Sequence, residues 1–260
     1  MELGLIILRR AEGVWIEDVD GNVFIDFVSG GYVANTGHRH PEIVKAAKRQ
    51  LDKFVCGFSE SRLKLADRLA GITPGHFKKD VFFGHSGSDS NDTAIELARW
   101  STRRPYIIAF LGAYHGITLG ALSMTSTLLQ RKGCHPLVPG IITMPYPYCY
   151  RCPFRLEHPE CELQCLRYIE DYAFKTFCPA QDVAGVNIEL IQGDAGWIVP
   201  PNDYLPALKK MCEKYAIPFI AEEVQTGFGR TGKIFACEHW NIEPDIICIC
   251  LLYTSDAADE

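Results

Sequence analysis

The sequence predicts an α/β fold in which a mostly parallel sheet is covered by helices on both faces. Short runs rich in Val, Ile and Phe alternate along the chain with segments whose apolar residues recur at helical spacing. Continuous apolar runs of this kind are typical of strands buried on both faces of a parallel sheet. The composition, 47% hydrophobic and 22% charged over 260 residues, fits a globular chain with a large core and excludes a disordered or collagen-like one.

The first elements are expected to be a hairpin and two helices. Residues 14–27 contain two strand-like runs, VWIEDV and VFIDF, joined by Asp20-Gly21-Asn22, which is a good hairpin signal. Pro41 opens a helix over residues 41–54. A second helix over residues 62–72 stops at Thr73-Pro74-Gly75.

The rest of the chain alternates strand and helix. Strands are expected over residues 81–84, 106–110, 184–191, 217–221 and 245–249, and helices over residues 89–102 and 202–215. This alternation predicts the parallel sheet.

Charge and targeting signals exclude several classes of partner. The chain has 26 Lys and Arg against 32 Asp and Glu, a net charge of −6, which gives no footprint for nucleic acid or an anionic membrane. The longest apolar run is too short to span a membrane. Arg9 and Arg10 follow the first apolar stretch instead of preceding it, unlike a cleavable signal peptide. The eleven cysteines are interpreted as mostly reduced thiols, so we expect a cytoplasmic location.

The last eleven residues are expected to be foreign to the protein. Residues 250–260, CLLYTSDAADE, follow the strand-like EPDIICI without turn chemistry. They resemble the translated read-through of a sequencing-library adapter, a segment to be excluded from the fold. The alternative is a genuine polar tail after a last strand.

Two motifs follow the first expected strands of the sheet. Ser86-Gly87-Ser88 precedes a helix, and backbone N–H groups at a helix N-terminus bind anions such as phosphate. Alone, the motif is better explained as an ordinary N-cap at Ser88 or Asp89. Tyr114 and His115 stand next to Gly116 after a strand, where they could line a ligand pocket. Alone, they are better explained as a buried Tyr and a satisfied His.

Two acidic motifs follow later strands. Glu189 and Asp194 flank an amide, and Glu222-Glu223-Val224-Gln225 comes directly after an apolar run. Ligands of open α/β sheets bind at the carboxyl ends of the strands. The alternative for both motifs is solvated loop charge.

A competing motif overlaps the second acidic one. Residues 227–233 fit the pattern G-x-x-x-x-G-K, but Ile234 stands where a nucleotide-binding loop needs Ser or Thr. The stretch also does not run directly from a strand into a helix, which argues against nucleotide hydrolysis.

Together, these segments resemble the class III aminotransferases of the ornithine and 4-aminobutyrate type, which use pyridoxal 5′-phosphate on the fold-type I scaffold. The resemblance covers residues 13–249 and is carried by DVDGNVFIDF, NTGHRHPEIVKAAKRQ, SGSDSNDTAIELAR, YHG, IQGDAG, EEVQTGFGRTGK and EPDII. It implies an incomplete large cofactor-binding domain over residues 44–249, preceded by the N-terminal part of a small α+β domain over residues 1–43. It also implies a homodimer with the active site at the subunit interface.

The resemblance also implies roles for individual residues. The implied cofactor contacts are Ser86, Gly87 and Ser88 for the phosphate, Tyr114, His115 and Val224 for the walls around the ring, Gln225 for the ring hydroxyl and Glu222 for the pyridine nitrogen. The family normally has Asp at the position of Glu222, so the carboxylate is kept and the side chain is one methylene longer. Glu189 and Asp194 match an acidic pair of the family near the substrate; Glu189 is expected among the cofactor-binding residues and Asp194 on the substrate side. Tyr32, with Gly30 and Gly31, is expected to face substrate.

The lysine that the chemistry requires is missing. In the family, a lysine a few residues after the EPDII strand forms the Schiff base with the cofactor and moves the proton. Leu251 stands at that position, just inside the suspected foreign tail. We therefore expect this chain as written to be inactive.

Four cysteines form a separate candidate site. Cys149, Cys152, Cys161 and Cys165 have spacings that could hold a structural zinc ion, with His158 as a possible substitute ligand. The alternative is a packed loop with free thiols or an opportunistic disulfide, and the gap between the two pairs is shorter than in common zinc ribbons.

Three functional hypotheses follow from the resemblance. In the first, the parent protein is a transaminase that moves an amino group from an ω-amino acid, such as 4-aminobutyrate or ornithine, to a 2-oxo acid. In the second, it is an amino-acid racemase with the same cofactor. In the third, the tail is genuine and the protein binds the cofactor without catalysis.

Overall fold

The computed structural model describes residues 6–53 and 57–250 and divides the chain into two compact units. The first unit ends at Leu69, and the second runs from Ala70 to Cys250. The domain boundary expected near residue 43 stays a prediction. Within the described residues, no helix combines the length and the apolar character that a membrane crossing requires.

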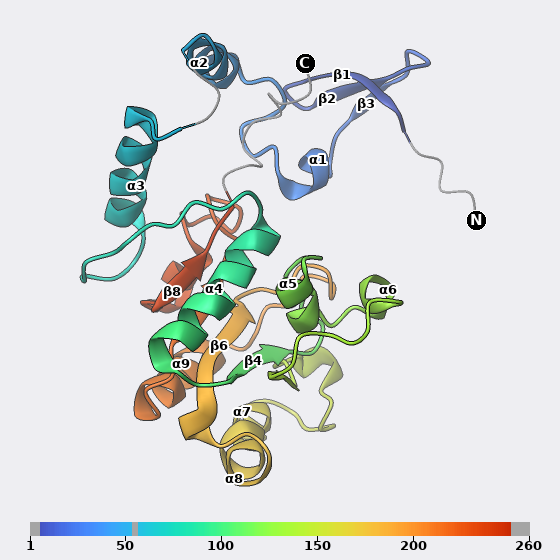
Figure 1. Ribbon diagram of the computed structural model, residues 1–260. Coiled ribbons are helices and arrows are strands. Elements are labelled where there is room, and N and C mark those ends of the chain that lie inside the picture. The colour runs from blue at the N-terminus through green and yellow to red at the C-terminus, as the bar shows by residue number, and fades with distance from the viewer. Residues whose placement is uncertain (1–5, 54–56, 251–260) are drawn as a thin grey trace. The chain divides into compact units, whose positions relative to one another are not determined.

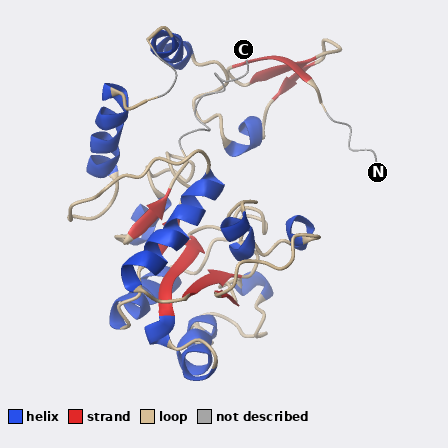
Figure 2. Cartoon of the chain, in the orientation of Figure 1, coloured by secondary structure: helices blue, strands red, loops and turns tan. Residues whose placement is uncertain are grey.

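The first unit contains a three-stranded antiparallel sheet. Its strands are β1 (Leu8–Glu12), β2 (Trp15–Asp18) and β3 (Val23–Ile25), in the order β1-β2-β3 (Figure 2). The predicted hairpin is confirmed: Trp15 pairs with Ile25, and the Asp18 carboxylate accepts the N–H of Asp20 and Asn22 in the turn. The strand β1 was not predicted, because its sequence LRRAE lacks an apolar pattern.

Three helices follow the small sheet. They are α1 (Ser29–Tyr32), α2 (Pro41–Leu51) and α3 (Glu60–Ile72). The helix α2 begins at Pro41 as predicted, because proline at the first helical position loses no hydrogen bond. Its expected last residue, Phe54, lies outside the described residues, and α3 begins two residues before its predicted start.

The second unit is built on a five-stranded sheet whose pairs are all parallel. The strands are β4 (Tyr106–Phe110), β5 (Ile141–Met144), β6 (Val183–Glu189), β7 (Phe219–Glu222) and β8 (Ile246–Cys248). Their order is β5-β4-β6-β7-β8. The four predicted strands from residue 106 onward are confirmed with small shifts, whereas β5, only four residues long, was not predicted.

Helices cover both faces of this sheet, as predicted. Ile107 and Ala109 of β4 pack with Ala94, Ile95 and Ala98 of α4 (Gly87–Thr102). The alternate residues Ile108 and Phe110 belong to a second core that includes Leu205, Leu208 and Met211 of α9 (Tyr204–Lys214). Successive side chains of a strand point to opposite faces, so α4 and α9 lie on opposite sides of the sheet (Figure 1).

Shorter elements complete the second unit. They are α5 (Leu119–Met124), α6 (Leu128–Arg131), η1 (Cys149–Arg151), α7 (Gln164–Tyr168), η2 (Ile169–Ala173), α8 (Phe174–Thr176), η3 (Ala180–Asp182) and η4 (Ala236–Trp240).

One predicted strand is wrong. Residues 81–84 form no strand and lie in the loop before α4 (Figure 2). The run VFFG pairs with no strand among the described residues, and the Phe82 side chain is 72% exposed. Apolar character alone does not make a strand unless another strand accepts its backbone hydrogen bonds.

Candidate active site at the carboxyl ends of the strands

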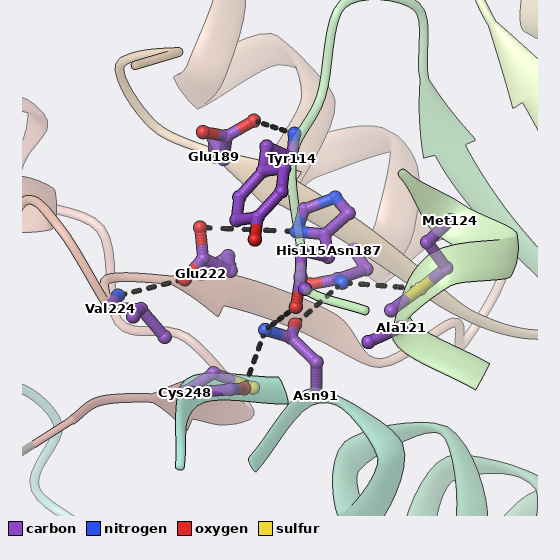
Figure 3. A network of polar contacts seen from close by, with 12 residues as sticks. Asn91, Tyr114, His115, Ala121, Met124, Asn187, Glu189, Glu222, Val224 and Cys248 are labelled. Carbon is purple, nitrogen blue, oxygen red and sulfur yellow. Dashed lines mark hydrogen bonds and ion pairs between the residues drawn. The ribbon is translucent and has the colours of Figure 1, made fainter. Parts of the chain in front are cut away.

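The motifs selected from the sequence converge at one edge of the large sheet. The loops after β4, β6 and β7 begin where these three adjacent strands end, and the first turn of α4 lies beside them (Figure 3). Glu189 and Glu222 are the last residues of β6 and β7 and are paired in register. The parallel arrangement therefore brings four segments that are distant in sequence to one place.

The first turn of α4 is capped by a side chain and, with Gly87 and Gly116, forms a closely packed anion-binding turn that we call the cradle. Ser86 is the N-cap, and its Oγ accepts the N–H of Asp89 at 3.1 Å. The motif thus contains an N-cap, but the expectation that Ser88 or Asp89 forms it is wrong, because α4 already begins at Gly87. A Cβ atom on Gly87 would lie 2.6 Å from Cγ1 of Val224, and one on Gly116 would collide with the Ser88 hydroxyl. Glycine at these two positions lets the loops approach the N-terminus of a 16-residue helix, where N–H groups attract an anion.

The two carboxyl groups at the strand ends are buried and interact with each other. Glu222 Oε1 accepts the N–H of Val224 at 2.8 Å, and Glu189 accepts the N–H groups of Tyr114 and Gly193. Burial raises the pKa of Glu189 to about 8. Burial also raises the pKa of Glu222 well above its ordinary value, and the neighbouring charge of Glu189 raises it further. Two buried carboxylates this close disfavour double ionisation, so the site favours a bound positive charge.

His115 is a neutral imidazole without a hydrogen-bond partner on its ring. Burial lowers the pKa of His115 to about 3, and among the described residues neither ring nitrogen has a partner within hydrogen-bond distance. Its Nδ1 lies 3.9 Å from Oε2 of Glu222. A histidine whose ring nitrogens are hydrogen-bonded was expected here, and that expectation is wrong. The ring lies in the core beside a carboxyl group but makes no hydrogen bond to it.

Three of the remaining predicted residues, Tyr114, Gln225 and Asp194, are less buried than Glu189 and Glu222. Tyr114 is half-buried, and burial, then the negative charge of Asp194, raises its pKa. Gln225 is half-buried and lies so close to Gly193 that a Cβ there would collide with its Oε1. Asp194 is exposed. Tyr32 belongs to the first compact unit, so its expected place at the substrate stays a prediction.

Sequence reasoning assigned no individual role to three buried polar residues, although Glu223 belongs to the second acidic motif and Asn91 to the segment SGSDSNDTAIELAR. Asn91 lies one helical turn after Gly87 and donates to the carbonyl oxygens of Gly87 and His115. Asn187 is the polar residue inside the apolar strand VAGVNIE, a signal that could have identified it, because a buried amide needs partners. Glu223 accepts the N–H groups of Ala236 and Cys237 and the Thr226 hydroxyl. Glu223 therefore anchors the start of η4.

The competing nucleotide-loop hypothesis has no support in the geometry. Residues 227–233 form a succession of turns, and the next element is η4, which begins only at Ala236. A phosphate-binding loop instead runs directly from a strand into a helix.

The four cysteines of the candidate metal site line one small cavity together with His158. Cys149 is exposed, Cys165 is buried, and all four of these cysteines are free thiols. Among the described residues, no group of three or more His, Cys, Asp or Glu is arranged to hold a metal ion. This arrangement gives the zinc hypothesis no support, and the hypothesis stays a prediction. Leu251, the expected position of the lysine, lies outside the described residues.

Comparison with known proteins places this geometry in context. The profile of the Aminotransferase class-III family matches residues 2–254. The alanine/serine racemase of Pyrococcus horikoshii is 46% identical over 253 residues, which are 93% of this chain and 53% of that protein. The leucine/methionine racemase of Thermococcus litoralis is 39% identical (94% and 56% covered), and a probable 4-aminobutyrate aminotransferase of Bacillus subtilis is 34% identical (92% and 56%).

Solved structures show the same similarity. An (S)-enantioselective omega-transaminase from Thermomicrobium roseum superposes with a TM-score of 0.87 at 35% identity, covering 94% of this chain and 57% of that one. A PLP-bound amine transaminase from an uncultivated Pseudomonas species superposes with a TM-score of 0.85 at 31% identity, covering 94% and 58%. The chain thus spans about half the length of the relatives it matches.

Proposed function

Because this chain belongs to the class III aminotransferases, we propose that the whole protein transfers an amino group from an amino acid to a 2-oxo acid. The observation that supports the proposal most directly is the buried carboxyl group of Glu222 at the end of β7, beside the glycine-lined N-terminus of α4. A carboxylate and an anion site on neighbouring segments suit a ligand with a cationic ring and a phosphate. Pyridoxal 5′-phosphate, the cofactor of this family, has both.

The residues present fit the cofactor. The phosphate would be held by the N–H groups of the Gly87–Ser88 turn and by the Ser88 hydroxyl. The ring would lie between Tyr114 and Val224, with Gln225 at its hydroxyl. When bound, the cofactor supplies an electron sink for the negative charge that develops on the substrate when a proton leaves the carbon that bears the amino group.

Glu222 would keep the pyridine nitrogen protonated. Without a cation nearby, burial and Glu189 keep the pKa of Glu222 high. A positively charged ring nitrogen lowers that pKa, because an opposite charge favours the ionised carboxylate. The neutral His115 brings no second positive charge that would compete for the same carboxylate.

For the amino donor we propose an ω-amino acid such as 4-aminobutyrate or ornithine. The support comes from the relatives named as an omega-transaminase and a probable 4-aminobutyrate aminotransferase. We also propose a cytoplasmic homodimer, in which Tyr32 faces the substrate and Asp194 lies on the substrate side. Because Leu251 occupies the position of the reactive lysine, this chain alone should not turn over substrate.

A second candidate reaction is amino-acid racemisation. The specific observation in its favour is that relatives named as racemases are 46% and 39% identical to this chain over the aligned residues, against 34% for the 4-aminobutyrate relative. Racemisation and amino transfer both begin with proton removal from the carbon that bears the amino group. The residues described above would hold the ring and the phosphate, and both reactions would need them equally.

One experiment separates the two reactions. The complete gene product is incubated with cofactor, 2-oxoglutarate and 4-aminobutyrate, ornithine, or L-alanine, and the products are followed by keto-acid assay and chiral chromatography. The first proposal predicts new L-glutamate and a carbonyl product from the donor. Appearance of D-alanine without new pyruvate or glutamate would replace it with the racemase. Absence of both, with cofactor bound, would leave the non-catalytic binding protein.

A further inference from the structure

Two buried asparagines connect the parts of the candidate site. Asn91 lies in the second turn of α4 and Asn187 lies in the middle of β6, and both side chains are almost fully buried. Neither residue is among those expected to contact the cofactor, although Asn91 lies in the segment that begins with Ser86-Gly87-Ser88. Figure 3 shows them between the α4 turn and the His115 loop.

The Asn91 amide links two of the converging segments directly. Its Nδ2 donates to the carbonyl oxygen of Gly87 at 3.0 Å and to that of His115 at 3.2 Å. One side chain therefore holds the anion-binding turn and the loop that carries Tyr114. Both protons of the Nδ2 group are used, so the amide cannot rotate without breaking one of these bonds.

Asn187 fixes the orientation of the Asn91 amide. Its Nδ2 donates to Asn91 Oδ1 at 3.1 Å and contacts the Met124 sulfur at 3.3 Å. The donor from β6 leaves Asn91 only one orientation, with its own donors directed at the two carbonyls. Cys248 of β8 adds a weaker contact from its Sγ to the Ser90 carbonyl at 3.7 Å, so β6 and β8 both hold the first turns of α4.

We propose that Asn91 is a positioning residue that sets the spacing between the phosphate-binding turn at Gly87–Ser88 and the ring wall at Tyr114, and that Asn187 orients it. This inference rests on the proposed function, because it assumes that a phosphate and a ring bind at these two places. Its specific consequence is that loss of the Asn91 amide weakens ligands that must reach both places. Ligands that use the ring wall alone are affected much less.

The experiment compares pyridoxal 5′-phosphate with pyridoxal, which lacks the phosphate. Dissociation constants for both are measured on the complete gene product by equilibrium dialysis, for the wild type and for Asn91→Leu, which keeps the branched shape and removes the amide. We expect the dissociation constant for pyridoxal 5′-phosphate to rise at least tenfold and that for pyridoxal to change by less than threefold. The ³¹P resonance of the bound phosphate should shift toward that of the free cofactor.

Two further variants guard against a purely structural explanation. Asn91→Gln keeps the amide and should recover part of the affinity for pyridoxal 5′-phosphate. Ala98 also lies on the buried side of α4, away from the hydrogen bonds of Asn91. Ala98→Gly lowers the stability of the helix without removing a hydrogen bond. It should weaken both ligands equally or neither. If Asn91→Leu does not fold, Asn187→Leu provides the same comparison with a smaller expected change in the ratio.

The outcomes are distinguishable. An equal loss of affinity for both ligands in Asn91→Leu, or no loss for either, would overturn the positioning role while leaving the proposed function in place. A wild-type protein that binds neither ligand would overturn the proposed function itself, and the positioning role with it.

Discussion

Glu222 of β7 lies opposite Glu189 of β6 in the register of two parallel strands, and the charge of Glu189 adds to burial in raising the pKa of Glu222. The two residues come from motifs that are more than thirty positions apart in the sequence. Their interaction disfavours ionisation of both carboxyl groups and favours a proton or a cationic ligand group near them.

Stability without cofactor should fall as the pH rises from about 6.5 to 8. The pKa of Glu189 is raised to about 8 in the folded chain, so the folded state keeps a proton that the unfolded chain has already lost. That stabilisation is complete below the unfolded pKa and is lost as the pH rises through the folded one. Each such group contributes a slope of at most about 1.4 kcal/mol per pH unit. Urea unfolding at a series of pH values measures it.

The lower limit of that window comes from His115. Its pKa is lowered to about 3, so the unfolded state binds the extra proton below about pH 6.5 and stability there rises with pH, opposing the effect of Glu189. Glu189→Gln should flatten the fall above pH 6.5, whereas Glu160→Gln, at an exposed position, should not. An unchanged slope in Glu189→Gln would contradict this assignment.

Replacing Glu222 should separate charge from length. In the complete protein, Glu222→Gln removes the negative charge facing the pyridine nitrogen, and we expect a loss of about 100-fold or more in kcat/KM, the scale of losing one preorganised electrostatic contact. Glu222→Asp keeps the charge and should lose much less. Steady-state kinetics with the natural substrate measure both variants. A loss in Glu222→Asp as large as that in Glu222→Gln would show that side-chain length matters as much as charge at this position.

The close approach at Gly87 should be intolerant of any side chain. In Gly87→Ala, the new Cβ would meet Val224 Cγ1 at 2.6 Å, so the turn and the β7 loop must separate. We expect at least tenfold weaker binding of pyridoxal 5′-phosphate, measured by dialysis. The matched control is Gly71→Ala in α3, where a Cβ has nothing within 4 Å, and alanine should stabilise the helix by up to about 1 kcal/mol. Normal cofactor affinity in Gly87→Ala would contradict the cradle.

Thiol reactivity should follow burial in the cysteine-rich segment. Cys149 is exposed, whereas Cys165 is buried and its pKa is raised to about 12 by burial. Because the thiolate is the reactive form, iodoacetamide at pH 8 should label Cys149 long before Cys165, as mass spectrometry of peptides would show. Equal labelling rates would contradict the described burial.

The same protein tests the zinc hypothesis. About one equivalent of zinc in the purified protein, together with protection of Cys149, Cys152 and Cys161 from iodoacetamide, would confirm it. A zinc content below roughly a tenth of an equivalent would dismiss it.

The sequence determined the type of most elements and the membership of the candidate site. Residues such as Ile107, Ile108 and Leu208 follow strand and helix periods that are local properties of the chain, and local periods can be recognised without a structure. The four motifs could be grouped in advance because the carboxyl ends of parallel strands meet at one edge of a sheet. Their joint resemblance to one family then assigned the cofactor.

Only the tertiary structure decided which local patterns found partners. Residues 81–84 form no strand because no strand in the described part of the chain pairs with them, whereas the short β5 pairs with β4. The neutral state of His115, the coupling of Glu222 to Glu189 and the tether from Asn187 through Asn91 depend on burial and on atoms 24 to 96 residues apart in the chain. Hydrogen bonds and desolvation act through space, so these properties belong to the fold and not to any segment of the sequence.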